Sequence, residues 1–151
     1  MAVRNCILIL GIICSLISNS KGITEQDTVA FKKCKEENGM TAADEVSAKS
    51  SLLNDTITDT QKCYWVCLLT AFGEINADGS LNEENAVKEF KDLIAHHKIQ
   101  YSDEELKSDV ADCAKIRGDS TCDKAFAPWK CLMDIGKRLY RKIMSTDIRH
   151  G

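Results

Sequence analysis

Apolar residues recur at helical spacing along most of this chain and rarely alternate as they would in a β-strand. Proline occurs once, and glycine falls mostly at the junctions between the periodic segments. Both features favour an all-α fold. With the start and stop signals of helices added, the pattern predicts six helices, over about residues 24–38, 44–53, 58–72, 82–97, 102–114 and 121–143.

Two of these segments have a distinctive pattern. Residues 61–72 (QKCYWVCLLTAF) are apolar nearly all round, which is typical of a buried central helix. The last segment keeps its apolar spacing but contains Pro128, which we expect to kink or divide it, with a seventh helix from about Gly136 as the alternative. The predicted fold is therefore a compact bundle of six or seven helices.

Residues 1–22 have the pattern of a secretory signal peptide. Arg4 precedes an apolar run from Cys6 to Ile17, and small polar residues follow, with cleavage expected after Ser20 or Gly22. The run is shorter than the roughly 20 apolar residues that span a bilayer. We therefore expect a secreted, extracellular protein without membrane insertion, consisting of a single domain over residues 23–151.

Loss of residues 1–22 changes the charge and the cysteine count. The whole chain has 151 residues, 8 cysteines and a formal charge of −3, which argues against a nucleic-acid partner. Residues 23–151 have a charge of −5 and keep six cysteines, an even number that implies three disulfides in an oxidising compartment. No paired Cys or His motif for zinc is present.

The cysteine positions exclude some pairings. Cys63 and Cys67 are one helical turn apart, where side chains are poorly oriented to join each other. Cys122 and Cys131 lie on opposite faces of one helix, roughly 13 Å apart along its axis. Each of these helices is therefore tied to two neighbours, but several of the fifteen connectivities remain open.

The spacing C-x28-C-x3-C-x45-C-x8-C-x8-C resembles that of insect odorant-binding proteins of the pheromone and general-odorant-binding type. The strings KCYWVCL at 62–68, CDKAF at 122–126 and Lys130-Cys131 also resemble that family. The resemblance covers the whole mature chain. It implies the disulfides Cys34–Cys67, Cys63–Cys122 and Cys113–Cys131, which satisfy both exclusions.

The resemblance further implies a carrier of small hydrophobic molecules, such as odorants or pheromones, in an internal apolar cavity. A cavity of about 300 Å³ would cost roughly 7 kcal/mol of stability, which three disulfides could offset. Protease resistance is the alternative reason for the disulfides. The candidate ligand-binding residues are apolar positions on the predicted inner faces: Leu69, Phe72, Phe90, Ile94, Val110, Ala114, Phe126, Trp129, Leu132 and Met133.

Further candidates lie outside the cavity walls. The basic C-terminal tail, residues 134–151, has a net charge of +3 and could cover the pocket mouth or simply be solvated. His96 and His97, at the end of the fourth helix, could act as a pH switch. Asn54 begins a glycosylation sequon, and residues 74–85 resemble a calcium loop but lack the acidic residue at position twelve, so we interpret them as a turn.

We expect no enzyme activity, cofactor or metal, because no nucleophile, base and orienting group stand out together. The expected partners are a small apolar ligand and, beyond it, an odorant receptor or a second copy of the chain. The alternative function is a secreted interaction protein that acts through its surface and basic tail, without a small ligand.

Overall fold

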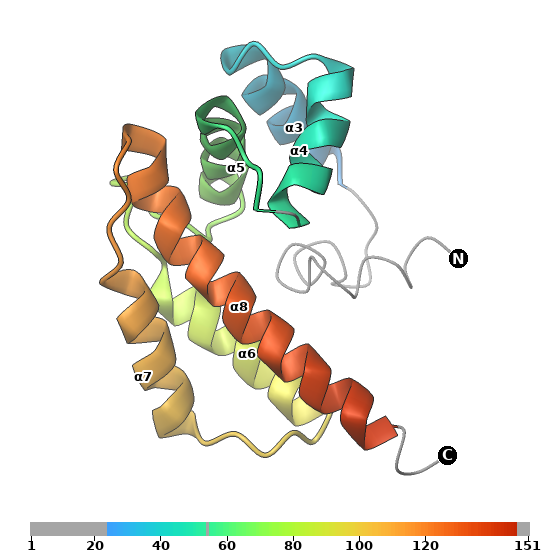
Figure 1. The fold of residues 1–151 in the computed structure, drawn as a ribbon, viewed down its shortest axis with the longest axis vertical. Coiled ribbons are helices and arrows are strands. Elements are labelled where there is room, and N and C mark those ends of the chain that lie inside the picture. Colours follow the sequence, from blue (N-terminus) through green and yellow to red (C-terminus); the bar gives the residue numbers. More distant parts are fainter. Residues whose placement is uncertain (1–23, 54, 148–151) are drawn as a thin grey trace.

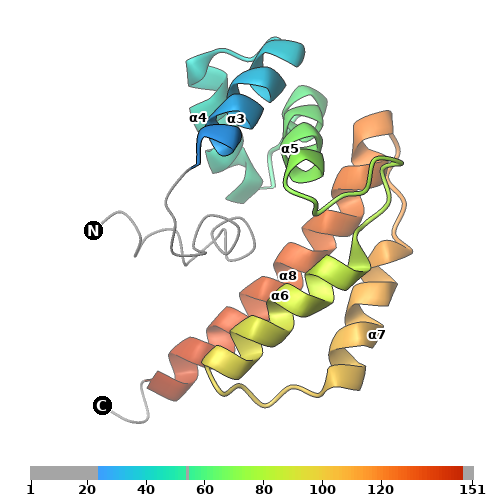
Figure 2. The ribbon, with the colours of Figure 1, turned by 180° about the vertical axis from the view of Figure 1, so that it is seen from behind.

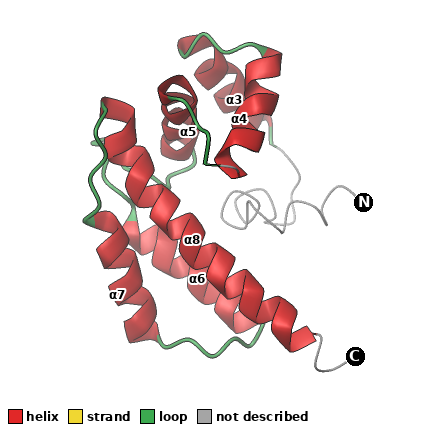
Figure 3. Ribbon diagram, viewed as in Figure 1, coloured by secondary structure: helices red, strands yellow, loops and turns green. Residues whose placement is uncertain are grey.

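The computed structural model describes residues 24–53 and 55–147, so the predicted signal peptide, Asn54 and residues 148–151 lie outside the described residues. It contains six α-helices joined by loops (Figures 1 and 3), and no β-strand occurs within the described ranges. The helices are α3 (Glu25–Glu37), α4 (Ala42–Leu53), α5 (Asp59–Ala71), α6 (Glu83–His96), α7 (Asp103–Ala114) and α8 (Thr121–Asp147). The all-α prediction is confirmed.

Local signals in the sequence set the helix starts. The Thr58 side chain accepts a hydrogen bond from the Gln61 backbone N–H at 3.2 Å, and the Gln61 side chain accepts one from the Thr58 N–H at 2.9 Å. Thr24 and Asp27 form the same reciprocal pair at the start of α3, and Ser102 accepts from the Glu105 N–H at 3.1 Å. These contacts satisfy backbone donors that a helix cannot satisfy internally.

Helix α8 continues through Pro128 and Gly136, so the six-helix prediction holds and the alternative of a seventh helix from about Gly136 is wrong. An interior proline removes a backbone hydrogen bond and costs about 3 kcal/mol. Packing offsets this cost, because Trp129, Leu132 and Leu139 of α8 are fully buried. Gly136 faces Phe90 of α6, at a distance where a Cβ atom would make ordinary van der Waals contact, 3.7 Å from Phe90 Cε1.

The α5–α6 loop, which resembles a calcium loop in sequence, is a tight turn closed by a single β-bridge between Ile75 and Leu81. The Asn76 N–H donates to the Ser80 carbonyl at 2.8 Å, and Gly79 takes a φ of 84°, a left-handed conformation that glycine adopts without steric cost. Glu74, immediately before this bridge, is completely buried.

Helix α8 occupies the centre of the arrangement and contacts α5, α6 and α7. Figures 1 and 2 show α6, α7 and α8 side by side from both directions, with α3, α4 and α5 grouped at the other end of the molecule. One apolar cluster extends through both groups, and its largest buried side chains include Trp129, Tyr64 and Phe126. The interface between α5 and α8 therefore connects the two ends of the fold.

Three disulfides fix these helices to one another. Cys34–Cys67 joins α3 to α5, Cys63–Cys122 joins α5 to α8, and Cys113–Cys131 joins α7 to α8, with Cα–Cα distances of 5.6, 5.0 and 5.4 Å. The pairing implied by the family resemblance is confirmed. The prediction that α5 and α8 are each tied to two neighbours is also confirmed.

Candidate ligand-binding site

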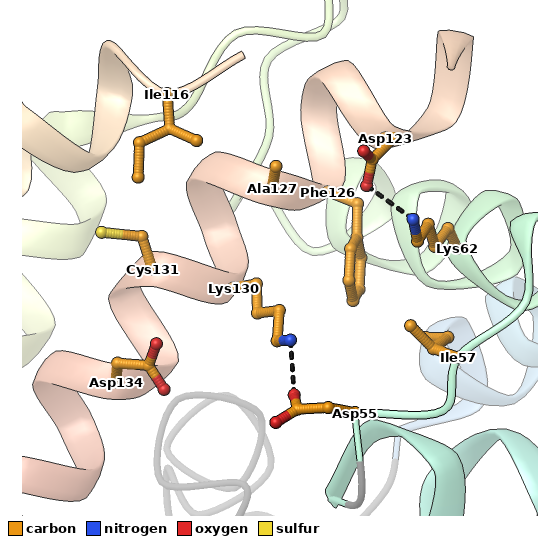
Figure 4. Close-up of a pocket in the computed structure, with 10 residues that line it drawn as sticks. All are labelled: Asp55, Ile57, Lys62, Ile116, Asp123, Phe126, Ala127, Lys130, Cys131 and Asp134. Atoms are coloured by element: carbon orange, nitrogen blue, oxygen red, sulfur yellow. Dashed lines mark ion pairs between the residues drawn. The ribbon is translucent and has the colours of Figure 1, made fainter. Parts of the chain in front are cut away.

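A cleft of about 340 Å³ opens between the first half of α8, the start of α5 and the linker between α4 and α5 (Figure 4). Ile116, in the loop before α8, contributes to one wall. Among the described residues, the lining is formed by Asp55, Ile57, Lys62, Ile116, Asp123, Phe126, Ala127, Lys130, Cys131 and Asp134. Its volume lies at the lower end of the range for small-molecule sites.

Ion pairs line the rim of this cleft. Lys62 Nζ lies 2.9 Å from Asp123 Oδ1, and Lys130 pairs with Asp55 across the gap between α8 and the linker (Figure 4). The hydrogen bond from Lys62 lowers the pKa of Asp123, and the one from Lys130 lowers the pKa of Asp55. These carboxyl groups therefore stay ionised and paired at neutral pH.

Each charged side chain that the described residues contribute to the lining has a partner, since the remaining one, Asp134, has its Oδ1 atom 3.3 Å from Lys137 Nζ. A charged ligand would have to displace one of these pairs, whereas a neutral ligand would not. The apolar lining is formed by Phe126, Ile57, Ala127 and Ile116. The cleft therefore combines an apolar wall with a rim of paired charges.

Behind this lining, aromatic rings continue into the α5–α8 interface. The ring centroids of Phe126 and Trp129 are 5.7 Å apart, and those of Trp129 and Trp65 are 6.4 Å apart with an interplanar angle of 18°. The ring of Tyr64 lies next to that of Trp65, with 5.7 Å between their centroids. Such close aromatic pairs stabilise the interface beyond the area they bury.

The ten candidate wall residues all belong to the apolar cluster or pack against it. Phe126 lines the cleft, and Trp129 lies directly behind it. Phe72, Ile94 and Ala114 are half-buried, and the others are buried: Leu69, Phe90, Val110, Leu132 and Met133. Their role in ligand binding remains a prediction.

The ionic rim was missed by the sequence reasoning. One signal could have found part of it, because Lys62 precedes Cys63 and Asp123 follows Cys122. Once these two cysteines are paired, a lysine and an aspartate of opposite charge must lie close together. The Lys130–Asp55 pair has no such signal, since the conformation of the α4–α5 linker decides it.

Two further candidates lie outside the cleft lining, except for Asp134, the first residue of the tail. His96 and His97 are exposed at the end of α6 with their rings edge to face, 4.8 Å between centroids, and their switch role remains a prediction. Residues 134–147 of the predicted tail form the second half of α8, where Arg138 pairs with Asp109 of α7 at 3.1 Å. The described part of the tail is thus attached to α7.

The fold and the cleft together define a class of protein, a small all-α binding protein braced by three interlocked disulfides. The chain belongs to the PBP/GOBP family, whose sequence model matches residues 19–134. This confirms the resemblance to odorant- and pheromone-binding proteins. No curated protein and no solved structure gives a significant match to the chain.

Membership of this family implies a general role as a small-ligand carrier, because it is a family of binding proteins and not of enzymes. Members of the family are secreted. Among the described residues, no helix has both the length and the apolar character needed to cross a membrane.

Proposed function

We propose that the protein is a secreted carrier that binds one small, neutral, mostly apolar molecule, such as an odorant or pheromone, between α5 and α8. The observation that carries this proposal is the 340 Å³ cleft, whose apolar lining continues through Phe126 into the aromatic interior. The predicted signal peptide supports secretion.

The energetics of burial are sufficient for such a role. Burial of about 300 Å² of apolar ligand surface contributes roughly 7 kcal/mol before the costs of ordering and association. This range permits micromolar binding with broad selectivity, because burial is not directional. The candidate wall residues would then form the inner part of the binding site, with the paired charges at its entrance.

The test fills the cleft with a side chain. In Ala127→Phe, a half-buried residue of the cleft lining becomes aromatic and occupies part of the space. We expect a loss of affinity of about tenfold or more for an apolar fluorescent probe, N-phenyl-1-naphthylamine, measured by titration. Ala95→Phe, the same change at an exposed position on α6, is the matched control and should bind normally.

The proposal fails if the wild-type protein shows no saturable binding of the probe and no displacement by volatile apolar compounds. Native mass spectrometry of the protein as purified adds an independent result. A small molecule retained through purification supports the carrier. A ligand-free species that instead binds another protein supports the alternative function through the surface.

A further inference from the structure

Two buried indole N–H groups lie at the α5–α8 interface without a hydrogen-bond acceptor. Trp129 is completely buried and Trp65 is 3% exposed. Among the described residues, neither Nε1 atom has a hydrogen-bond partner. Both groups are strong donors, and an indole N–H has no other hydrogen-bonding capacity.

An unsatisfied buried donor is unfavourable, because it gives up its hydrogen bond to water and gains nothing in return. Buried polar groups in folded proteins are nearly all satisfied by protein, by ordered water or by a ligand. Two such donors on stacked rings therefore point to an acceptor that occupies this interface when the protein functions.

The position of the two rings connects them with the cleft. Trp129 packs against Phe126, a residue of the cleft lining, and also stacks with Trp65. A molecule that entered past Phe126 would meet Trp129 first. The only polar groups it would then encounter on these three rings are the two indole N–H groups.

We propose that Trp65 and Trp129 select ligands that carry an oxygen acceptor, with at least one indole N–H donating a hydrogen bond to a carbonyl, ester or ether oxygen on an otherwise apolar molecule. This inference rests on the proposed function and specifies its ligand class. A carboxylate is disfavoured, because the two lysines that the described residues contribute to the cleft, Lys62 and Lys130, are already paired with aspartates.

The experiment compares 2-decanone with decane, which has the same chain length and no oxygen. The chain contains two tryptophans, so ¹⁵N-labelling of tryptophan gives two indole N–H signals in the NMR spectrum, assigned with Trp65→Phe and Trp129→Phe. We expect 2-decanone, and not decane, to move at least one indole proton signal downfield as the hydrogen bond forms.

Affinities of the variants give a second readout. In the variant that removes the donating indole, the affinity for 2-decanone should fall about five- to tenfold more than the affinity for decane. General damage to the site would lower the affinity for both ligands alike, so it would leave the ratio of the two affinities unchanged. Tyr140→Phe, which removes a hydroxyl elsewhere on α8, should leave the ratio of the two affinities unchanged.

The outcomes separate the two proposals. If both compounds bind but the indole signals and the affinity ratio do not distinguish them, this inference is wrong while the carrier function stands. The same holds if the indole protons are already hydrogen-bonded to water in the free protein and stay so with 2-decanone. If neither compound binds, both the inference and the proposed function fail.

Discussion

At the scale of single residues, Glu74 is a fully buried carboxyl group paired with a second one, Glu89. The Asn85 amide donates to one oxygen of each, at 3.0 Å to Glu74 and 3.5 Å to Glu89. The other oxygen of each is buried and accepts no hydrogen bond from the part of the chain that the structure describes. One shared proton would satisfy both, because a protonated carboxyl donates to a carboxylate.

This pair makes stability depend on pH. Burial, followed by the Glu89 charge, raises the pKa of Glu74 to about 8, whereas in the unfolded chain the group titrates near 4.5. Between pH 4.5 and about 8, the folded state therefore holds a proton that the unfolded state has released. The free energy of unfolding should be highest below the window and fall by up to about 1.4 kcal/mol per pH unit as pH rises towards 8.

Glu74→Gln tests this directly, because the glutamine is neutral at every pH and similar in shape. In urea titrations from pH 5 to 9, the variant should lose this pH dependence and exceed the wild type in stability at pH 9. Glu84→Gln, at an exposed position on α6, is the control and should keep the wild-type slope. An unchanged slope in Glu74→Gln would contradict the shared proton.

At the scale of elements, the helix starts could be predicted from the sequence because caps are local. Thr58 and Gln61 are three residues apart and bond each other whatever the rest of the fold does. The continuity of α8 could not be predicted, because it depends on what Trp129 and Leu132 meet in three dimensions. The burial of Glu74 was missed for the same reason, since its sequence neighbours are mostly those of a polar turn.

Glycine at position 136 weakens α8, since glycine in a helix interior is less favourable than alanine by about 0.5–1 kcal/mol. Gly136→Ala should therefore raise the free energy of unfolding by about that amount, because the added Cβ would only touch Phe90. Thermal or urea unfolding measures the change. A destabilised Gly136→Ala protein would contradict the observed packing of α8 on α6.

Gly118, before α8, should respond in the opposite direction. A Cβ atom there would lie 2.3 Å from the Asp123 backbone oxygen, which is far inside van der Waals contact. Gly118→Ala should cost about 1–3 kcal/mol of stability, the range typical of overpacking. Because Asp123 pairs with Lys62 at the cleft rim, weakened probe binding should accompany this loss.

At the scale of the whole molecule, one disulfide, Cys63–Cys122, joins the two helix groups, and each of the other two braces one group internally. The sequence separations of the three disulfides are 33, 59 and 18 residues. Cys63–Cys122 has the largest separation, and it joins α5 to α8, the two helices between which the ligand is proposed to bind. The family resemblance supplied this pairing, whereas the cysteine positions alone left several connectivities open.

The lengths of the loops that the disulfides close predict which disulfide contributes more to the free energy of unfolding. In the chain-entropy model, loss of Cys63–Cys122 costs about 4 kcal/mol and loss of Cys113–Cys131 about 3 kcal/mol at 25 °C. Double replacements by serine, compared by urea unfolding, check this order. The Cys63→Ser, Cys122→Ser protein should also bind the apolar probe more weakly, whereas a larger loss of stability from the Cys113–Cys131 replacement would contradict the expected order.

The central claim is that an apolar guest enters between α5 and α8. A crystal structure of the protein with 1-bromodecane tests it most directly, because the anomalous signal of bromine marks the bound chain. We predict one ordered bromoalkane next to Phe126 and Trp129, reached from the cleft. Saturating ligand with no anomalous peak between these helices, or with peaks only on the outer surface, would contradict the claim.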